Sequence, residues 1–217
     1  MIVLVIAPHP DDEVLGCGGT IRKYVKLGND VYVCVVTEAY TPDWSKDYIN
    51  NRRKEIEKCK QILGVKKYFF LNFPTVKIDT FPQKDLNAKI SLVINEVNPD
   101  MLFIPHKGDL NMDHRLIFEA SLVASRPINH KIKRILSYET VSETEWGQAI
   151  EPFIPNVYVD ISETINLKKD AMKAYKSELK QYPHPRSLEI IEALAKKRGS
   201  EVGLNFAESF VMIREIM

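Results

Sequence analysis

The sequence opens with MIVLVIAPHPDDEVLGCGGT, residues 1–20, and this stretch decides the fold. Residues 2–7 form a continuous apolar run rich in β-branched side chains, which predicts a strand buried on both faces of a sheet. Polar residues follow at once, and no basic region precedes the run, which is far too short to span a membrane. We therefore interpret residues 2–7 as a core strand and not as a signal peptide.

The same alternation continues along the chain. Further strands are predicted at residues 31–37, 68–73, 101–105, 135–139, 157–161 and 210–216. Helices are predicted at residues 20–27, 51–63, 85–97, 114–124, 166–179 and 187–198. Strands that alternate with helices indicate parallel βαβ units, so we expect an α/β fold, a Rossmann-like three-layer sandwich with a mostly parallel sheet. Residues 1–217 should form a single domain in which the last third extends the sheet and covers one end of it.

The composition is that of an ordinary globular protein, with 30 Lys and Arg residues against 29 Asp and Glu residues among 217. A formal net charge of +1 argues against a general nucleic-acid or anionic-membrane binder. The cysteines Cys17, Cys34 and Cys59 are odd in number and far apart, which indicates neither a disulfide framework nor a paired-cysteine metal site. We expect a cytoplasmic protein with no membrane span, and the sequence leaves open whether it forms a homo-oligomer.

The polar chemistry begins where the first strand ends. His9, Asp11, Asp12 and Glu13 place one imidazole and three carboxylates within five residues, beside two prolines. Open parallel sheets bind their ligands beyond the carboxyl ends of the strands. Clustered carboxylates repel one another and raise each other's pKa unless a cation lies among them. Because His and Asp are suitable ligands for Zn²⁺, this segment predicts part of a divalent-metal site.

Two other interpretations of this segment stay open. Gly16, Gly18 and Gly19 follow the strand, as in a dinucleotide-binding loop, but their order is G-C-G-G and acids occupy the place of the phosphate donors. The acids could instead simply cap the following helix, because carboxylates suit the positive end of the helix dipole. Capping accounts neither for His9 nor for the two prolines.

A second polar segment follows the fourth predicted strand. It contains two histidines and two acids, His106, Asp109, Asp113 and His114. A parallel sheet can bring this strand end beside the first one, and His114 would then complete a His/Asp/His set with His9 and Asp12. Three protein ligands with one open position are typical of a catalytic zinc site. Asp109 or Asp113 would accept hydrogen bonds that fix the orientation of the ligand histidines.

Together these motifs resemble those of the PIG-L/LmbE family of zinc-dependent N-deacetylases. The resemblance rests on H-P-D-D-E at residues 9–13 and D-H-R at residues 113–115. It extends to G-C-G-G-T at residues 16–20 and to an R-x-x-E…L-G stretch that starts at Arg52. The resemblance implies removal of the acetyl group from an N-acetylglucosamine-type sugar or sugar conjugate. Because it runs over roughly the first 125 residues, it implies a catalytic half at 1–125 and a part at 126–217 that extends the sheet and covers the substrate.

Carried onto this chain, the resemblance also implies a role for each motif residue. The ligands of the metal are His9, Asp12 and His114. Asp11 is the general base, Arg52 contacts the substrate, and Glu13 orients the loop or a ligand histidine. The metal is Zn²⁺ in the family, although Fe²⁺ or another divalent ion suits His and Asp ligands as well.

One position departs from the family pattern. Many members have a histidine three residues before the last ligand, where it is associated with polarising the substrate carbonyl or stabilising the oxyanion. This chain has Asn111 there. An amide donates a hydrogen bond but carries no positive charge, so His106, Arg52 or His184 are alternatives for the oxyanion role.

The segment Y-P-H-P-R at residues 182–186 has two interpretations. It is either a rigid linker or a recognition loop in which His184 lies near the reacting carbonyl and Arg186 binds a phosphate or carboxylate of the substrate. Substrate contacts are thus expected from Arg52, Asn111, His184 and Arg186. The expected function is a metal-dependent sugar N-deacetylase. The alternatives are an amidase that acts on a thiol–sugar conjugate and a nucleotide-binding module without catalysis.

Overall fold

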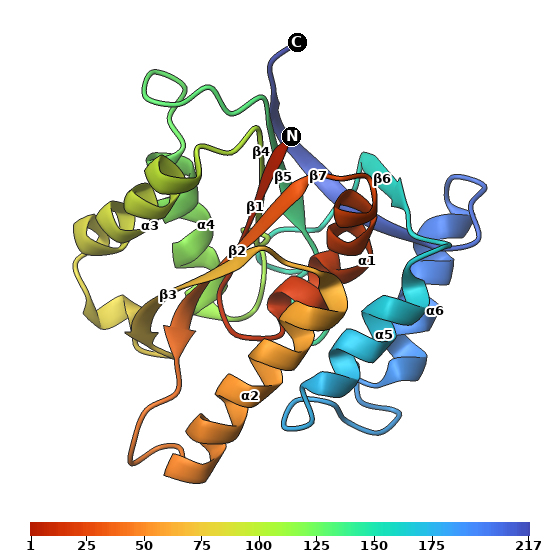
Figure 1. The fold of residues 1–217 in the computed structure, drawn as a ribbon, viewed down its shortest axis with the longest axis horizontal. Helices are drawn as coiled ribbons and strands as arrows, with labels where there is room; N and C mark the ends of the chain where they lie inside the picture. Colours follow the sequence, from red (N-terminus) through yellow and green to blue (C-terminus); the bar gives the residue numbers. More distant parts are fainter.

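The computed structural model describes all residues, 1–217, and contains one seven-stranded sheet with the strand order β3-β2-β1-β4-β5-β7-β6 (Figure 1). The strands are β1 (Ile2–Ala7), β2 (Asp30–Glu38), β3 (Lys67–Pro74), β4 (Met101–Ile104), β5 (Arg134–Tyr138), β6 (Val157–Asp160) and β7 (Ala207–Glu215). The pairs from β3 to β5 are all parallel, and β7 is antiparallel to both β5 and β6. The predicted α/β fold with a mostly parallel sheet is confirmed.

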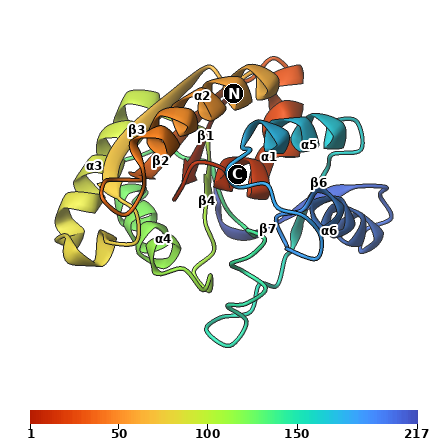
Figure 2. The ribbon, with the colours of Figure 1, turned by 90° about the horizontal axis from the view of Figure 1, so that it is seen from below.

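Helices cover both faces of the sheet. They are α1 (Asp12–Lys26), α2 (Lys46–Leu63), α3 (Gln83–Val97), α4 (Met112–Ala124), α5 (Ile165–Ala174) and α6 (Leu188–Ser200), with a short 3-10 turn at Ile78–Thr80. Figure 2 shows α3 and α4 on one face and α1, α2 and α5 on the other. The strand β1 serves both layers, because Val3 and Val5 belong to one apolar cluster and Leu4 and Ile6 to the other. None of these helices is long and apolar enough to cross a membrane.

The helix predicted at residues 20–27 begins eight residues earlier than expected, at Asp12, so the glycine-rich segment lies inside α1. A β-carbon on Gly16 would lie 2.2 Å from Cδ2 of Tyr138, and one on Gly19 would lie 2.8 Å from Cβ of Ile161. The glycines therefore allow α1 to lie close against β5 and the end of β6. This packing role leaves no dinucleotide-binding loop here.

The helix predicted at residues 166–179 is shorter than expected and ends at Ala174. The chain turns at Tyr175, whose fully buried hydroxyl donates a hydrogen bond of 2.5 Å to Glu13. Residues 175–187 consequently leave the helix axis and run toward the end of β1. The next helix, α6, starts as predicted after Ser187, whose hydroxyl accepts a hydrogen bond from the Ile190 amide.

The strand order reverses beside β1. From β1 the chain proceeds to β2 and β3 on one side, and it then crosses back to β4 on the other side. In open α/β sheets the crevice at the carboxyl ends of such strands is where ligands bind. The two polar segments of the sequence follow β1 and β4, so the topology brings both to this crevice.

Candidate active site

The structure brings three predicted metal ligands together at the crevice. His9 lies in the loop after β1, Asp12 is the first residue of α1, and His114 is the third residue of α4. Nδ1 of His9 lies 3.2 Å from Oδ2 of Asp12 and 3.3 Å from Nε2 of His114. The third side of the triangle, from Nε2 of His114 to Oδ2 of Asp12, is also 3.3 Å.

This triangle fits one face of a metal coordination tetrahedron. Ligand atoms about 2.0–2.1 Å from a tetrahedral ion lie about 3.3 Å from one another. The donors are two imidazole nitrogens and one carboxylate oxygen, which is a set that divalent transition metals accept. The residues present therefore fit a divalent metal ion, with the fourth position left for water or substrate.

Each histidine of the triangle also has a carboxylate partner on its other ring nitrogen. Nε2 of His9 lies 3.1 Å from Oδ2 of Asp113, and Nδ1 of His114 lies 2.8 Å from Oδ2 of Asp109. Asp109 is itself fixed, because its Oδ1 accepts a 2.6 Å hydrogen bond from the Thr144 hydroxyl. Such partners hold the ring orientation and leave the opposite nitrogen directed at the metal position.

The charges of the site favour a cation at its centre. Burial alone would lower the pKa of His9, but hydrogen bonds to Asp113 and Asp12 raise that pKa to about 9. Burial acts in the same direction on His114, and its neighbours Asp12 and Asp109 raise the pKa of the ring well above its usual range. The two histidines hold the pKa of Asp12 well below its usual range against the effect of burial. Positive charge is thus stabilised where the three donor atoms meet.

Asp11, the predicted general base, has an unusual backbone conformation. Its φ of 120° lies in the region that L-residues rarely adopt, at the N-cap of α1. Such strain is held only when the surrounding structure fixes it. Here Oε2 of Glu13 accepts a 3.0 Å hydrogen bond from the Asp11 amide, while Oε1 of Glu13 accepts hydrogen bonds from the hydroxyls of Tyr175 and Tyr68. Glu13 therefore orients the loop and has no hydrogen bond to a ligand histidine.

The carboxyl group of Asp11 is buried beside Asp12 and between two guanidinium groups. It lies 3.9 Å from Arg52 and 3.5 Å from Arg186, and Glu178 bridges these arginines at 3.3 and 2.6 Å. Burial and the Asp12 charge raise the pKa of Asp11 to about 8, although both arginines act to lower it. A cation held by Asp12 would act in the same direction as the arginines, lowering the pKa of Asp11 and favouring its ionised, basic form.

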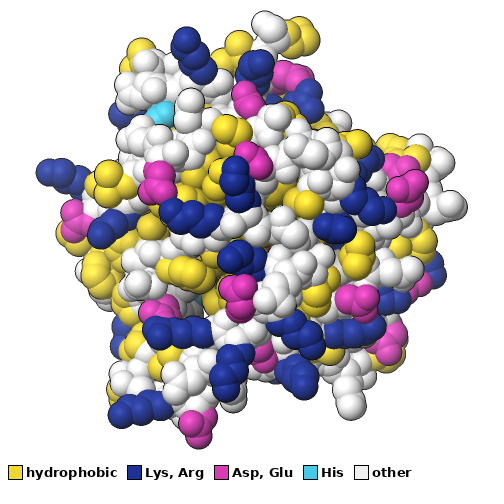
Figure 3. Space-filling model, viewed as in Figure 1, with side chains coloured by type: hydrophobic (Ala, Val, Ile, Leu, Met, Phe, Trp, Pro, Cys, Tyr) yellow, Lys and Arg dark blue, Asp and Glu magenta, His cyan; other side chains and the backbone are white.

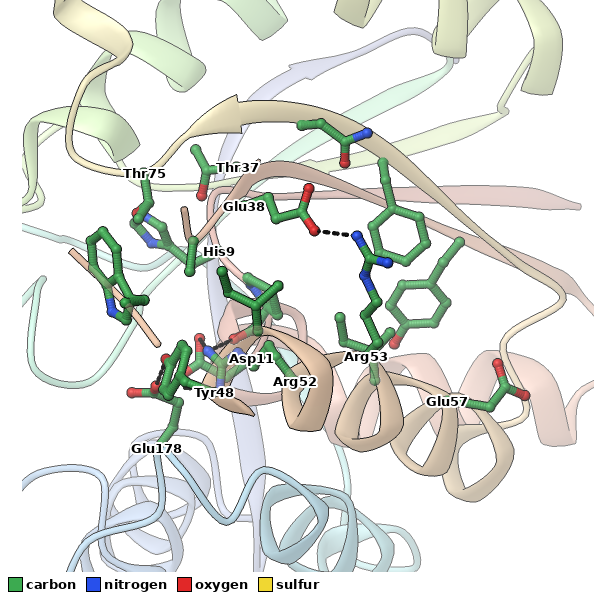
Figure 4. A pocket seen from close by; sticks show the side chains of 18 of the residues that line it. His9, Asp11, Thr37, Glu38, Tyr48, Arg52, Arg53, Glu57, Thr75 and Glu178 are labelled. Carbon is green, nitrogen blue, oxygen red and sulfur yellow. Dashed lines mark hydrogen bonds and ion pairs between the residues drawn. The ribbon is translucent and has the colours of Figure 1, made fainter. Parts of the chain in front are cut away.

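A pocket of about 650 Å³ opens beside these residues (Figure 4). His9 and Asp11 line it together with three of the predicted substrate contacts, Arg52, Asn111 and Arg186. The Arg52 guanidinium is largely engaged by protein groups, since it donates to Ser177 Oγ at 2.9 Å and to the Pro10 carbonyl.

Two histidines considered for the oxyanion role do not line the pocket. Nδ1 of His184 accepts a hydrogen bond from the Arg186 amide at 3.0 Å, so this ring supports its own loop. His106 is buried, with Nε2 3.2 Å from the Glu151 carbonyl and its ring edge-on to Phe153. Asn111 does line the pocket, and its Oδ1 caps α4 by accepting a hydrogen bond from the Asp113 amide.

Comparison with known proteins gives the family. The family described as PIG-L, GlcNAc-PI de-N-acetylase, matches residues 4–125, which is more than half of the chain. The chain belongs to the PIG-L family. This PIG-L protein is 32% identical over 184 residues to the uncharacterized deacetylase YaiS of Escherichia coli (strain K12), covering 81% of this chain and 90% of YaiS. It is 30% identical over 220 residues to the diacetylchitobiose deacetylase of Thermococcus kodakarensis, covering 95% and 80% of the two chains.

A solved structure has the same fold. The conserved protein TT1542 of Thermus thermophilus superposes on this PIG-L protein with a TM-score of 0.81 at 26% identity, over 99% of this chain and 96% of the other. The resemblance predicted from the sequence is confirmed, since the chain belongs to the PIG-L family and both relatives above are named as deacetylases.

Several residues around the PIG-L motifs carried no signal in the sequence. Glu178 lies within the stretch that was predicted to be helical, and its carboxylate meets Arg52, Arg186 and the Tyr48 hydroxyl. Tyr175 reaches Glu13 across 162 positions of the chain. No local spacing marks such contacts, because the partners come from separate elements.

Proposed function

We propose that this protein is a metal-dependent hydrolase that removes the N-acetyl group from an N-acetylglucosamine unit. The observation that carries the proposal is the triangle of donor atoms from His9, Asp12 and His114, with His9 and the adjacent Asp11 lining one pocket. The diacetylchitobiose deacetylase of T. kodakarensis and a probable N-acetyl-α-D-glucosaminyl L-malate deacetylase of Bacillus cereus, both relatives of this chain, act on acetylated glucosamine units by their names. Zn²⁺ is the metal we favour, since it accepts this donor set in a tetrahedron.

The reaction needs an activated water, a polarised carbonyl and a proton for the leaving amine. A divalent ion held by the three ligands would supply the first two, since it would lower the pKa of bound water to about 7 and act as a Lewis acid. Asp11 accepts the proton from the attacking water and delivers it to the amide nitrogen as the C–N bond breaks. Acetate and the free amine are the products, and Asp11 returns to its starting state.

Other residues of the chain hold Asp11 and the substrate. Glu13 keeps the Asp11 backbone in its strained conformation, and Arg186 faces the carboxyl from the opposite side. Because Oδ1 of Asn111 is occupied at the start of α4, its Nδ2 is the group left to donate a hydrogen bond to the acetamide oxygen. Because Arg186 contacts Asp11, residues 126–217 contribute to the reaction centre through the loop that carries Arg186.

An acetate-release assay with defined metals tests the proposal. N-acetylglucosamine and its conjugates should release acetate when the protein is loaded with Zn²⁺ or Fe²⁺. Asp11→Asn should keep the metal and lose about 10²–10⁴-fold in rate, the usual scale for a general base. His114→Ala should lose the metal itself.

The matched control is His130→Ala, which removes a histidine from the loop between α4 and β5 and should leave both metal content and rate unchanged. Full activity of Asp11→Asn would contradict the role of Asp11. Purified protein without near-stoichiometric divalent metal, and with no gain in activity on adding any, would contradict the metal scheme. The same assay with thiol-linked sugar amides distinguishes the amidase alternative.

A further inference from the structure

The turn that follows β5 reaches the side of the site where the metal ligands lie. Strands β4 and β5 are parallel neighbours, so the loops that leave their carboxyl ends start side by side. The loop after β4 carries Asp109, and the loop after β5 contains T-V-S-E-T at residues 140–144, which we call the β5 turn. These five residues lie beyond the family match, which covers residues 4–125. Contacts between the two loops therefore join the segment that carries the motifs to the rest of the chain.

Close backbone contacts fix the two loops against each other. The Leu110 amide donates a hydrogen bond of 3.1 Å to the Glu143 carbonyl. A β-carbon on Gly147 would overlap the carbonyl oxygen of Gly108, and one on Gly108 would overlap the carbonyl oxygen of Glu151. The loops approach this closely because neither glycine has a β-carbon. The β5 turn is consequently held in a fixed place relative to the loop after β4.

Two hydrogen bonds between its first and last residues close the β5 turn. The Thr144 amide donates to the Thr140 carbonyl at 2.9 Å, and the Thr140 amide donates to the Thr144 hydroxyl at 2.8 Å. Because this hydroxyl accepts from the amide, its single proton remains available to another acceptor. The hydroxyl donates that proton to Oδ1 of Asp109 at 2.6 Å. The direction of this bond is fixed, since an ionised carboxylate only accepts.

The Asp109 carboxylate depends on this donor. Its side chain is completely buried, and its two oxygens have one hydrogen-bond partner each, Nδ1 of His114 at 2.8 Å and the Thr144 hydroxyl. Figure 3 shows, by contrast, acidic side chains at the surface among Lys and Arg side chains, where water or a cation can replace a lost partner. A buried carboxylate has no such replacement, so removal of the hydroxyl would leave Oδ1 unpaired at a cost in free energy.

We propose that Thr144 is a positioning residue for the metal ligand His114 and that it acts through Asp109. With both oxygens bonded, the carboxylate cannot turn away from the imidazole, so the ring keeps Nε2 directed at the donor atoms of His9 and Asp12. Without the hydroxyl, the carboxylate turns toward another donor and the ring loses its fixed orientation. This role rests on the proposed function for the presence of the metal, and it makes metal affinity depend on a residue outside the matched segment.

Metal affinity, measured without any substrate, tests this role. Competition with a chelator of known affinity gives the Kd of the protein for Zn²⁺. Thr144→Val replaces the hydroxyl by a methyl group of similar size, and the Kd should rise about tenfold, at the lower end of the range for residues that orient a metal ligand without touching the metal. Thr144→Ser keeps the hydroxyl and should keep a Kd close to that of the wild type.

Two controls separate this effect from a general loss of stability. Thr164→Val makes the same change at a buried threonine whose hydroxyl donates to the Gly19 carbonyl at 2.9 Å and contacts neither a metal ligand nor Asp109. Ser142→Ala removes another hydroxyl of the β5 turn, which accepts a 2.8 Å hydrogen bond from Nε of Arg186. Both variants should bind Zn²⁺ with the wild-type Kd, whatever urea unfolding shows of their stability.

A double-mutant cycle tests whether Thr144 acts through Asp109. Asp109→Ala should itself weaken Zn²⁺ binding about 10–100-fold, and adding Thr144→Val to it should raise the Kd no further. A wild-type Kd in Thr144→Val, an equal loss in Thr144→Ser, or a full tenfold loss in the Asp109→Ala background would each overturn the role of Thr144 alone. If the wild type binds neither Zn²⁺ nor another divalent ion, the proposed function fails together with it.

Discussion

A buried ion pair holds the middle of α1, and removing its cation should strongly destabilise the protein. Lys168 of α5 donates to Glu208 of β7 at 2.6 Å and to the Leu15 carbonyl at 2.8 Å. Glu208 in turn accepts from the amides of Gly19 and Thr20 at 2.9 and 2.7 Å. In a regular helix the Gly19 amide would donate to the Leu15 carbonyl. Here the ion pair also forms hydrogen bonds with both groups, since Lys168 donates to the Leu15 carbonyl and Glu208 accepts from the Gly19 amide.

The magnitude of the loss follows from burial. Lys168 and Glu208 are only 5% and 4% exposed, so Lys168→Met leaves a carboxylate without its counter-charge in the interior. Removing one partner of a buried pair costs about 3–5 kcal/mol of unfolding free energy. For a chain of this length that corresponds to a fall in Tm of about 6–20 °C.

Urea unfolding followed by circular dichroism measures this loss. Lys66→Met is the matched control, because Lys66 forms a 2.8 Å pair with Asp30 in which both side chains are about half exposed, and its removal should have little effect. The double variant Lys168→Met/Glu208→Gln removes the buried charge and should recover part of the stability. The reasoning is refuted if Lys168→Met loses no more stability than Lys66→Met.

Two further predictions concern α1 and the metal. Gly16→Ala should cost about 1–3 kcal/mol or more by overpacking, because the new β-carbon would lie 2.2 Å from Cδ2 of Tyr138. Gly18→Ala should cost less, because its nearest contact would be Cγ of Lys168 at 3.1 Å, and thermal unfolding of both variants compares them. Zn²⁺ binding to metal-free protein should release protons at pH 7, because the pKa of His9 is raised to about 9 and that of His114 also lies above its usual range, so affinity should rise as the pH increases toward 9. Calorimetry in buffers of different ionisation enthalpy counts the protons, and a count of zero contradicts the charge assignment.

The sequence was sufficient to predict the sheet and the ligand triangle because both follow from local signals and one rule of topology. The apolar run of β1 and the helical periodicity of α3 identify elements whose two faces must be covered. Polar segments at the carboxyl ends of β1 and β4 then meet, since parallel strands beside a reversal of strand order share one crevice. His9 and His114 are 105 positions apart, yet their ring nitrogens lie 3.3 Å apart.

Other parts of the site could not be predicted because their signals are tertiary. Glycines are poor helix formers, so residues 16–19 were expected to precede the helix. Inside α1, close packing against Tyr138 requires Gly16, and close packing against Ile161 requires Gly19. The side chain of Glu178 likewise has no periodic or motif context, and only the turn after α5 brings it to Arg52 and Arg186. Tertiary packing overrode the low helix propensity of the glycines in α1, and tertiary contacts supplied the partners of Glu178.

Residues 126–217, which lie beyond the family match, contribute to the charge environment of Asp11 as well as to substrate choice. The family match covers residues 4–125, and this segment contains Asp11, Asp12 and Arg52. Asp12 has His9 and His114 as partners, whereas the adjacent buried carboxyl of Asp11 has only Arg52 within the matched segment. Arg186 and the bridging Glu178 come from the turns after α5, where they complete the ion-pair network around Asp11. A chain that kept only the matched segment would contain the motifs but would expose Asp11 to water on that side and lose the environment that sets its pKa.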